Sequence, residues 1–287
     1  MKMPLFALLF LTSITPSFGQ SSKGYIPLGP DSLYYETAGS GKDLVLIHDG
    51  LLHGDVWNEQ FAYFRRNFRV TRYDRRGYGR SSPATGSYTH LDDLKVLFDQ
   101  LHIDSAILVA CSSGGALAID FTLTYPQKVD GLVLVGAVVG GFSYSDHMRT
   151  RGGHIPESFE NELEENLYYA IDDPYLIYEK NTGVKKAAVE LLKAFPQRML
   201  RRPNFVRPDI PPSKRLSEIE VPTLILVGEF DIPDVHAVSG ALSNGIPNSR
   251  RLVIPASGHL IPMEQPDQFN QAVEDFIQAS LFGSGSL

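Results

Sequence analysis

The sequence predicts an α/β fold: a mostly parallel, doubly wound sheet with helices on both faces and an inserted helical lid. Short runs of leucine and β-branched residues alternate with longer helical patterns along most of the chain. Such continuous apolar runs are typical of parallel strands that are covered on both faces. The alternation stops near residue 140 and resumes near residue 218. We therefore expect a core of residues 20–139 and 218–287, with residues 140–217 as the lid.

The predicted elements follow one another as strands and crossover helices. Repeated strand–helix alternation implies parallel strands joined by right-handed connections. The parallel strands are expected at Leu44–Ile47, Val70–Tyr73, Ala106–Ala110, Leu132–Val135 and Leu224–Val227, after an antiparallel strand at Ser32–Thr37. The core helices are expected at Val56–Asn67, Thr89–Leu101, Gly114–Tyr125 and Gln265–Leu281.

The predicted lid has no strong strand pattern. It contains amphipathic windows at Pro156–Ala170 and Lys185–Leu200, followed by a proline-rich return over residues 203–212. Proline clusters mark loops between regular elements. A separate domain is the alternative, but the strand pattern resumes at Val221, which favours an insertion within one sheet.

Composition excludes several classes of protein. The chain has 287 residues, of which 43% are hydrophobic and 21% are charged, as in ordinary globular proteins. Its formal charge of -7, without a basic stripe, argues against a nucleic-acid partner. The single cysteine, Cys111, excludes an intramolecular disulfide framework. Downstream of the N-terminal segment, no apolar run is long enough to span a bilayer as an integral helix.

Residues 1–19 are expected to form an export signal. Lys2 supplies a positive charge, Pro4–Leu11 an apolar run, and Ser17-Phe18-Gly19 the small residues that precede cleavage before Gln20. An N-terminal strand or helix of the fold itself is the alternative. The signal predicts a periplasmic or secreted protein, and an exported chain with one cysteine suits a bacterial route.

The sharpest local pattern is a serine directly after an apolar strand and before a helix. Ser112 has Ala110 two residues before it and Gly114 two residues after it. A sharp strand-to-helix turn tolerates only small residues at these positions, which is the physical basis of the G-x-S-x-G nucleophile elbow. Ser113, which also has small residues two positions away, is the alternative register, and a plain loop is the alternative interpretation. Ser112 is preferred as the nucleophile because it follows the apolar run at once.

Two further residues come directly after predicted strands. Asp231 follows the strand at Leu224–Val227, and His259 follows a short strand ending near Ile254 through Gly258. A serine hydroxyl needs an imidazole to take its proton, and the imidazole needs an acid to orient it. The three residues occur in the order Ser, Asp, His, which is the order expected for a triad on this architecture. Taken singly, a loop His or Asp is more often a surface or capping residue.

The other histidines and polar clusters do not indicate a metal or a cofactor. No His-Glu-x-x-His or other compact ligand cluster is present. His48 and His53 are expected to be structural hydrogen-bond partners, and His90 and His154 are expected at the surface.

Four segments together make the chain resemble the α/β-hydrolase superfamily over nearly the whole sequence after residue 19. These are Leu46–Gly50 followed by Trp57, which resembles the His-Gly oxyanion loop; Tyr73–Ser81, which matches the D-x-R-G-x-G-x-S turn; the elbow at Ala110–Gly115; and Gly228–Asp231 with Gly258-His259. The chain departs from the family pattern at Ala110, where the elbow usually begins with Gly, and at Asp49, where the oxyanion loop usually has Gly.

The resemblance implies a Ser112–His259–Asp231 triad beneath a lid. It also implies an oxyanion hole formed by the amides of Gly50 and Ser113, and no cofactor. A carboxylate at Asp49 that pointed at the oxyanion would oppose catalysis, so this side chain is expected to turn away or to be paired.

The expected function is hydrolysis of small or medium carboxylic esters by a serine hydrolase. The resemblance also admits hydrolysis of C–C bonds, lactones or amides, as well as cofactor-free perhydrolysis. A ligand-binding protein that retains the pocket but turns over little is the alternative from another class.

Overall fold

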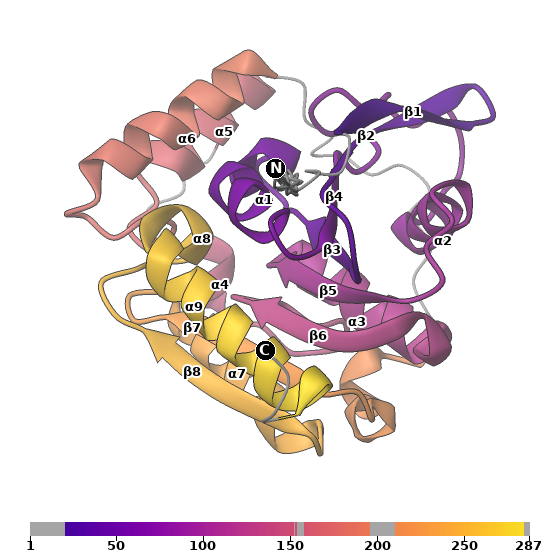
Figure 1. The fold of residues 1–287 in the computed structure, drawn as a ribbon. Helices are drawn as coiled ribbons and strands as arrows, with labels where there is room; N and C mark the ends of the chain where they lie inside the picture. Colours follow the sequence, from indigo (N-terminus) through magenta and orange to yellow (C-terminus); the bar gives the residue numbers. More distant parts are fainter. Residues whose placement is uncertain (1–20, 152, 154–157, 196–209, 284–287) are drawn as a thin grey trace, which may run out of the picture.

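An eight-stranded sheet lies at the centre of the computed structural model, which describes residues 21–151, 153, 158–195 and 210–283 (Figure 1). The strands are β1 (Ser22–Leu28), β2 (Asp31–Ala38), β3 (Asp43–Ile47), β4 (Arg69–Tyr73), β5 (Ala106–Cys111), β6 (Val129–Val135), β7 (Thr223–Gly228) and β8 (Ser249–Ile254). Their order in the sheet is β1-β2-β4-β3-β5-β6-β7-β8. β1 and β2 pair antiparallel, as do β2 and β4, and all other neighbours pair parallel.

Each central strand buries both of its faces. Leu44 and Leu46 of β3 belong to one apolar cluster, whereas Val45 and Ile47 belong to the cluster on the other side. This alternation is the period of two that a pleated strand imposes on its side chains. Because both faces are covered, most positions are apolar, and this explains the continuous runs in the sequence.

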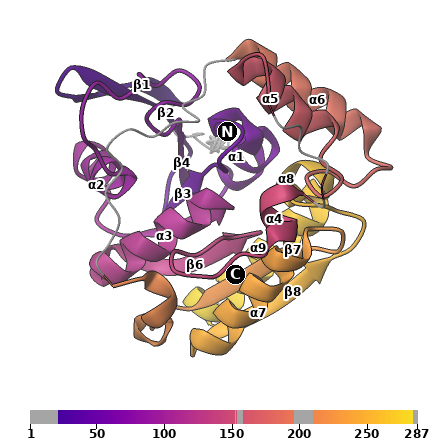
Figure 2. The ribbon, with the colours of Figure 1, turned by 180° about the vertical axis from the view of Figure 1, so that it is seen from behind.

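Helices cover the two faces of the sheet. One face packs against α1 (Asn58–Phe64) and α9 (Pro266–Ile277), and the other packs against α2 (His90–Gln100), α3 (Ser113–Thr124) and α7 (Pro233–Gly245). The first face is toward the viewer in Figure 1, and the second is seen from behind in Figure 2. The predicted mostly parallel sheet with helices on both faces is therefore confirmed.

Three α-helices lie in the described part of the stretch between β6 and β7. They are α4 (Asp146–Thr150), α5 (Glu162–Ile171) and α6 (Thr182–Ala194), and α5 and α6 lie side by side at one end of the molecule (Figures 1 and 2). The chain leaves and re-enters the core at neighbouring points, since the Ser213 amide donates to the Gly140 carbonyl over 3.1 Å. That this stretch acts as a lid stays a prediction.

Several element boundaries differ from those expected. α1 is shorter than predicted, because residues Gly54–Trp57 form a separate 3-10 turn, and α6 begins at Thr182 rather than at Lys185. Strand β1, helix α7 and the short helices α4 and α8 (Ile261–Glu264) were not predicted. α2 begins as expected after Thr89, whose hydroxyl caps the helix by accepting the Asp92 amide at 2.9 Å.

Some predictions concern residues that the structure does not describe. The export signal at residues 1–19, His154 and the end of the Lys185–Leu200 helix all lie outside the described residues, and they stay predictions. His90 is buried, with 4% of its surface exposed, so its expected surface position is wrong. Across the described ranges, no helix is both long and apolar enough to cross a bilayer.

The sheet brings the carboxyl ends of its parallel strands to one edge. β3 and β5 are neighbours in register, with Ile47 opposite Ala110, while β4 lies on the other side of β3. The chain runs from β3 to β4 on one side and then crosses from β4 to β5 on the other side of β3, so the strand order reverses here. Open α/β sheets place their binding sites at such a switch point. The loops that follow β3, β5, β7 and β8 all emerge at this edge.

Candidate active site

Ser112 occupies a strained turn between β5 and α3. Its backbone has φ 53° and ψ −117°, a left-handed conformation that side-chain-bearing residues rarely adopt. The Ser112 amide donates to the Val135 carbonyl of the neighbouring strand over 2.8 Å, which ties the turn to the sheet. Strain of this kind costs about 1–3 kcal/mol and persists only where the surrounding structure holds it. Ser113, by contrast, is the first residue of the helix.

The helix after the turn approaches the sheet closely because Gly114 has no side chain. A Cβ at Gly114 would lie 2.4 Å from the His48 carbonyl oxygen and 2.7 Å from that of Ile47. Any side chain here would push α3 away from the end of β3. This close approach explains why a small residue is required at Gly114, two positions after the predicted nucleophile.

His259 and Asp231 form a buried pair on neighbouring loops. His259 Nδ1 lies 2.8 Å from Asp231 Oδ2, and the second oxygen, Oδ1, accepts the Ile232 amide at 2.8 Å. Asp231 follows β7 and His259 follows β8, which are adjacent strands. An acid that accepts from Nδ1 leaves Nε2 as the nitrogen able to take a proton from a nucleophile.

The surroundings raise the pKa of His259 above its ordinary value of 6.5. Burial lowers the pKa, but the carboxylate of Asp231 raises it by more, through its charge and its hydrogen bond. Two charges farther away act in opposite directions, since Arg151 lowers the pKa and Asp49 raises it. The same carboxylate would stabilise an imidazolium at His259 if the ring took up a proton.

Glu264, which the sequence reasoning missed, secures the His259 loop. Its carboxylate accepts the Gly258 amide, the Tyr178 amide and the Asn181 side-chain amide, each at 2.8 Å. Burial raises the pKa of this carboxyl. Glu264 therefore joins the loop of the proposed base to the stretch before α6. The sequence shows an acidic residue five positions after the histidine, but it shows neither the burial of this residue nor its three hydrogen-bond partners.

Gly50 and Ser113 adjoin at the mouth of the sheet, as the predicted oxyanion hole requires. A Cβ at Gly50 would lie 2.9 Å from Ser113 Oγ. The Ser113 amide belongs to the first turn of α3, where backbone N–H groups have no partner within the helix. The partial positive charge of a helix N-terminus also favours an anion at this place.

Asp49 turns its carboxylate into its own loop. Oδ1 accepts the amides of Leu51 and Leu52 at 2.6 and 2.8 Å, and the residue is almost fully buried. Aspartate often folds back on the backbone of following residues in this way. One carboxylate oxygen is thus paired within a local turn, whereas the buried Oδ2 has no hydrogen-bond partner among the described residues, and Asp49 lines the pocket described below.

One pocket collects most of the predicted site residues. It has a volume of about 340 Å³ and is lined by Asp49, Gly50, Leu51, Ser112, Ser113, Met148, Arg149, Arg151, Tyr169, Asp173, Leu176 and His259. Asp231 lies behind His259. The sequence reasoning missed Arg151 and Asp173, which form an ion pair with 3.1 Å between Nε and Oδ2. Both residues come from the stretch between β6 and β7, where no local pattern marks a pocket wall.

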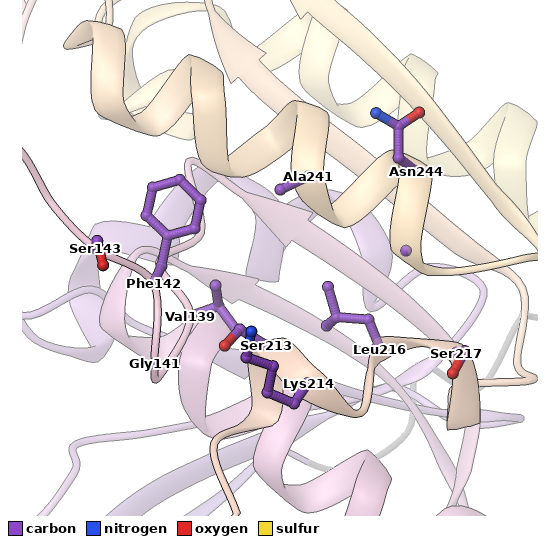
Figure 3. A pocket seen from close by; sticks show the side chains of 11 residues that line it. Val139, Gly141, Phe142, Ser143, Ser213, Lys214, Leu216, Ser217, Ala241 and Asn244 are labelled. Atoms are coloured by element: carbon purple, nitrogen blue, oxygen red, sulfur yellow. The ribbon is translucent and has the colours of Figure 1, made fainter.

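A larger cavity of about 490 Å³ lies elsewhere and contains none of the predicted site residues. Figure 3 shows its wall, formed where the chain leaves the core, by Phe142 and Ser143, and where it returns, by Ser213, Lys214 and Leu216, with Ala241 of α7 opposite. No nucleophile, base and acid meet there. The smaller pocket, which Ser112 and His259 line, is therefore the candidate active site. Among the described residues, no cluster of three or more His, Cys, Asp or Glu side chains could hold a metal ion.

Comparisons with known proteins agree with the fold. Residues 44–272 match the family model described as the alpha/beta hydrolase family. A 2-hydroxy-6-oxononadienedioate/2-hydroxy-6-oxononatrienedioate hydrolase from Paraburkholderia phymatum is 31% identical over 268 residues, covering 85% of this chain and 90% of the relative. A pimeloyl-[acyl-carrier protein] methyl ester esterase from Pectobacterium carotovorum is 29% identical, covering 86% of this chain and 99% of the relative.

A solved structure supports the same assignment. The thermophilic esterase from Thermogutta terrifontis superimposes with a TM-score of 0.74 at 28% sequence identity. The superposition covers 91% of this chain and 99% of the esterase.

Proposed function

This chain belongs to the alpha/beta hydrolase family, and we propose that it is a serine hydrolase that cleaves small or medium carboxylic esters. The observation that carries the proposal is the His259–Asp231 pair, whose imidazole lines the same pocket as the strained Ser112. Two of the similar proteins are esterases by name, which favours the ester bond.

The proposed reaction proceeds through an acyl-enzyme. Ser112 Oγ attacks the carbonyl carbon of the ester while His259 takes the hydroxyl proton, and the carbonyl oxygen becomes an oxyanion. The amides of Gly50 and Ser113 hold this oxyanion. When the C–O bond breaks, the alcohol leaves with the proton from His259. Water then attacks the acyl group with the same imidazole as base, which restores Ser112 and releases the acid.

Hydrolysis of a carbon–carbon bond is the second candidate function. It is favoured by the 31% identical relative, whose named substrates are keto acids that contain no ester bond. Hydrolysis of such a keto acid must cleave the bond beside a ketone carbonyl. The same nucleophile, base and oxyanion hole serve either bond, so the pocket residues alone do not discriminate between them.

The test combines a covalent probe with two kinds of substrate. Purified wild type, Ser112→Ala and Ser113→Ala are treated with a fluorophosphonate, and hydrolysis of p-nitrophenyl butyrate and of a 2-hydroxy-6-oxo-dienoate is recorded. We expect labelling and ester hydrolysis to vanish only in Ser112→Ala. Faster turnover of the dienoate than of the ester would support the second candidate. Absence of labelling and of both activities in the wild type would overturn the proposal.

A further inference from the structure

We propose that Arg75 is a positioning residue that aligns the two oxyanion-hole amides. The inference rests on the proposed function and concerns how its site is held in shape. Arg75 occupies the variable position of the D-x-R-G-x-G-x-S turn that follows β4, and it is buried, with 1% of its surface exposed. A buried guanidinium at a position that the motif leaves open needs a physical reason.

One nitrogen of Arg75 joins the two segments that carry the proposed donors. Nη2 donates to the Asp49 carbonyl oxygen, and it also donates to Ser113 Oγ over 2.9 Å. The first segment contains Gly50 and the second contains the Ser113 amide. The guanidinium itself packs over the Tyr78 ring, with 4.8 Å between Cζ and the ring centroid, which restrains its position.

The bond to Asp49 acts on the peptide unit that contains the Gly50 amide. The Asp49 carbonyl and the Gly50 N–H belong to one planar trans peptide, so they point in opposite directions. Fixing the carbonyl toward Arg75 therefore aims the N–H the other way. Hydrogen bonds accepted by the carbonyl also polarise the peptide, which strengthens its N–H as a donor.

His48 supplies the second hydrogen bond to the same carbonyl. Its Nε2 accepts the Arg75 amide at 2.9 Å, so Nδ1 carries the proton and donates to the Asp49 carbonyl at 2.7 Å. Burial, followed by the charge of Arg75, holds the pKa of His48 well below its ordinary value. The ring is therefore neutral and keeps this tautomer. Arg75 therefore acts on the Asp49 carbonyl in two ways. Its side chain donates to the carbonyl directly, and its backbone amide fixes the tautomer in which His48 donates to it.

The positive charge of Arg75 also offsets the carboxylate of Asp49. Both charges reach Cys111, the residue before the proposed nucleophile: burial mainly raises the pKa of its thiol, Asp49 and Asp231 raise it further, and Arg75 lowers it. In a loop where the family usually has Gly, a buried carboxylate thus comes with a buried guanidinium.

Arg76 provides a matched control, because it is the next residue and is nearly as buried. Its guanidinium pairs with Asp31 and Asp93 and does not contact the oxyanion loop in any interaction that the structure gives. Replacing either arginine by Met removes a buried charge of similar size. Only Arg75→Met removes the bonds to Asp49 and Ser113.

The experiment compares Arg75→Met, Arg75→Lys and Arg76→Met in the full chain. For each variant we measure kcat and KM for p-nitrophenyl butyrate and the rate of fluorophosphonate labelling. Both rates are corrected for the fraction of protein that is folded. Loss of one oxyanion donor costs about 10²–10³ in rate, so we expect kcat and labelling to fall about 10²-fold in Arg75→Met with KM within about threefold. Arg75→Lys keeps the charge and one donor, so we expect its kcat to be about tenfold higher than that of Arg75→Met. Arg76→Met keeps both rates within about threefold.

Three outcomes would overturn the inference. They are an unchanged kcat in Arg75→Met, equal losses in Arg75→Met and Arg76→Met, and a loss in Arg75→Met that appears only in KM. If Arg75→Met does not fold, Arg75→Lys and Ser113→Ala take its place, since each alters the contact between residue 75 and Ser113. A kcat equal to that of the wild type in both variants then overturns the inference as well. A wild type that neither reacts with the probe nor hydrolyses substrate overturns the proposed function itself, whereas the other outcomes leave that function standing.

Discussion

Gly136, at the end of β6, lies directly against the ring of His259. A Cβ on Gly136 would stand 3.0 Å from Nδ1 and Cε1 of that ring, and 3.2 Å from Asp231 Oδ2. The glycine also has a positive φ of 52°, which disfavours any side chain. The residue directly after β6 thus leaves room for the pairing of His259 with Asp231.

The first prediction concerns this contact. Gly136→Ala should displace the imidazole by a few tenths of an ångström and strain the backbone, lowering kcat about 10²-fold because catalytic geometry tolerates little misplacement. Steady-state kinetics on a p-nitrophenyl ester measures the effect. Gly183→Ala, at a helical position with no atom within 4 Å, serves as the control and should retain full activity. Wild-type kcat in Gly136→Ala would contradict the prediction.

The second prediction separates the strain at Ser112 from its chemistry. Ser112→Gly and Ser112→Ala should both abolish turnover, but only Gly relaxes the left-handed backbone conformation. We therefore expect the free energy of unfolding of Ser112→Gly to exceed that of Ser112→Ala by about 1 kcal/mol. Urea denaturation followed by circular dichroism provides the comparison. Equal stabilities would mean that the turn is not strained.

The third prediction concerns pH dependence. His259 acts as a base only when neutral, so kcat/KM should rise with pH through a midpoint above 6.5, because the pKa of His259 is raised. Arg151→Met removes a charge that lowers this pKa, so the midpoint should move upward. Asp49→Asn removes a charge that raises it, so the midpoint should move downward. Profiles of kcat/KM between pH 5 and 9 test both signs, and shifts in the same direction would refute the assignment.

The fourth prediction concerns stability away from the pocket. Arg76 is paired with Asp31 and Asp93, and all three side chains are nearly buried. Arg76→Met would leave two buried carboxylates without their cation, so we expect the free energy of unfolding to fall by about 3–5 kcal/mol. Urea titration measures it. The exposed Arg66, replaced in the same way, should change stability by less than about 0.5 kcal/mol.

The predicted strands correspond to the observed ones wherever both faces of a strand are buried. In β5 and β7 every residue is buried, so the sequence shows an uninterrupted apolar run. β1 escaped prediction because it lies at the sheet edge with most of its residues exposed and Pro27 within it. An edge strand needs no apolar run, so although β1 pairs with β2 through a two-residue turn, no continuous apolar pattern marks it in the sequence.

The candidate site was predictable to the extent that its residues follow strands. Ser112, Asp231 and His259 each come soon after an apolar run, and strand ends meet at one edge of a parallel sheet. Arg75 and Glu264 could not be recognised, since their roles come from partners far along the chain. His90 was predicted at the surface because histidine is polar and often exposed. The structure buries it against the rings of Tyr78 and Tyr88, which a local sequence pattern does not reveal.

The wall of the pocket comes from two parts of the chain that are under different structural constraints. The residues after β3, β5 and β8 are tied to the sheet by register, turns and close approaches, so few substitutions are compatible with them. Met148, Arg151 and Tyr169 come from the stretch after β6, whose described residues form no strand of the sheet. Leu176 belongs to the same stretch but is held in place, because its carbonyl accepts the amides of His259 and Leu260. Substitutions at Met148, Arg151 and Tyr169 can change the shape and charge of the pocket while the proposed catalytic residues stay in place. Directed evolution of this protein toward new substrates is therefore best begun at these three positions.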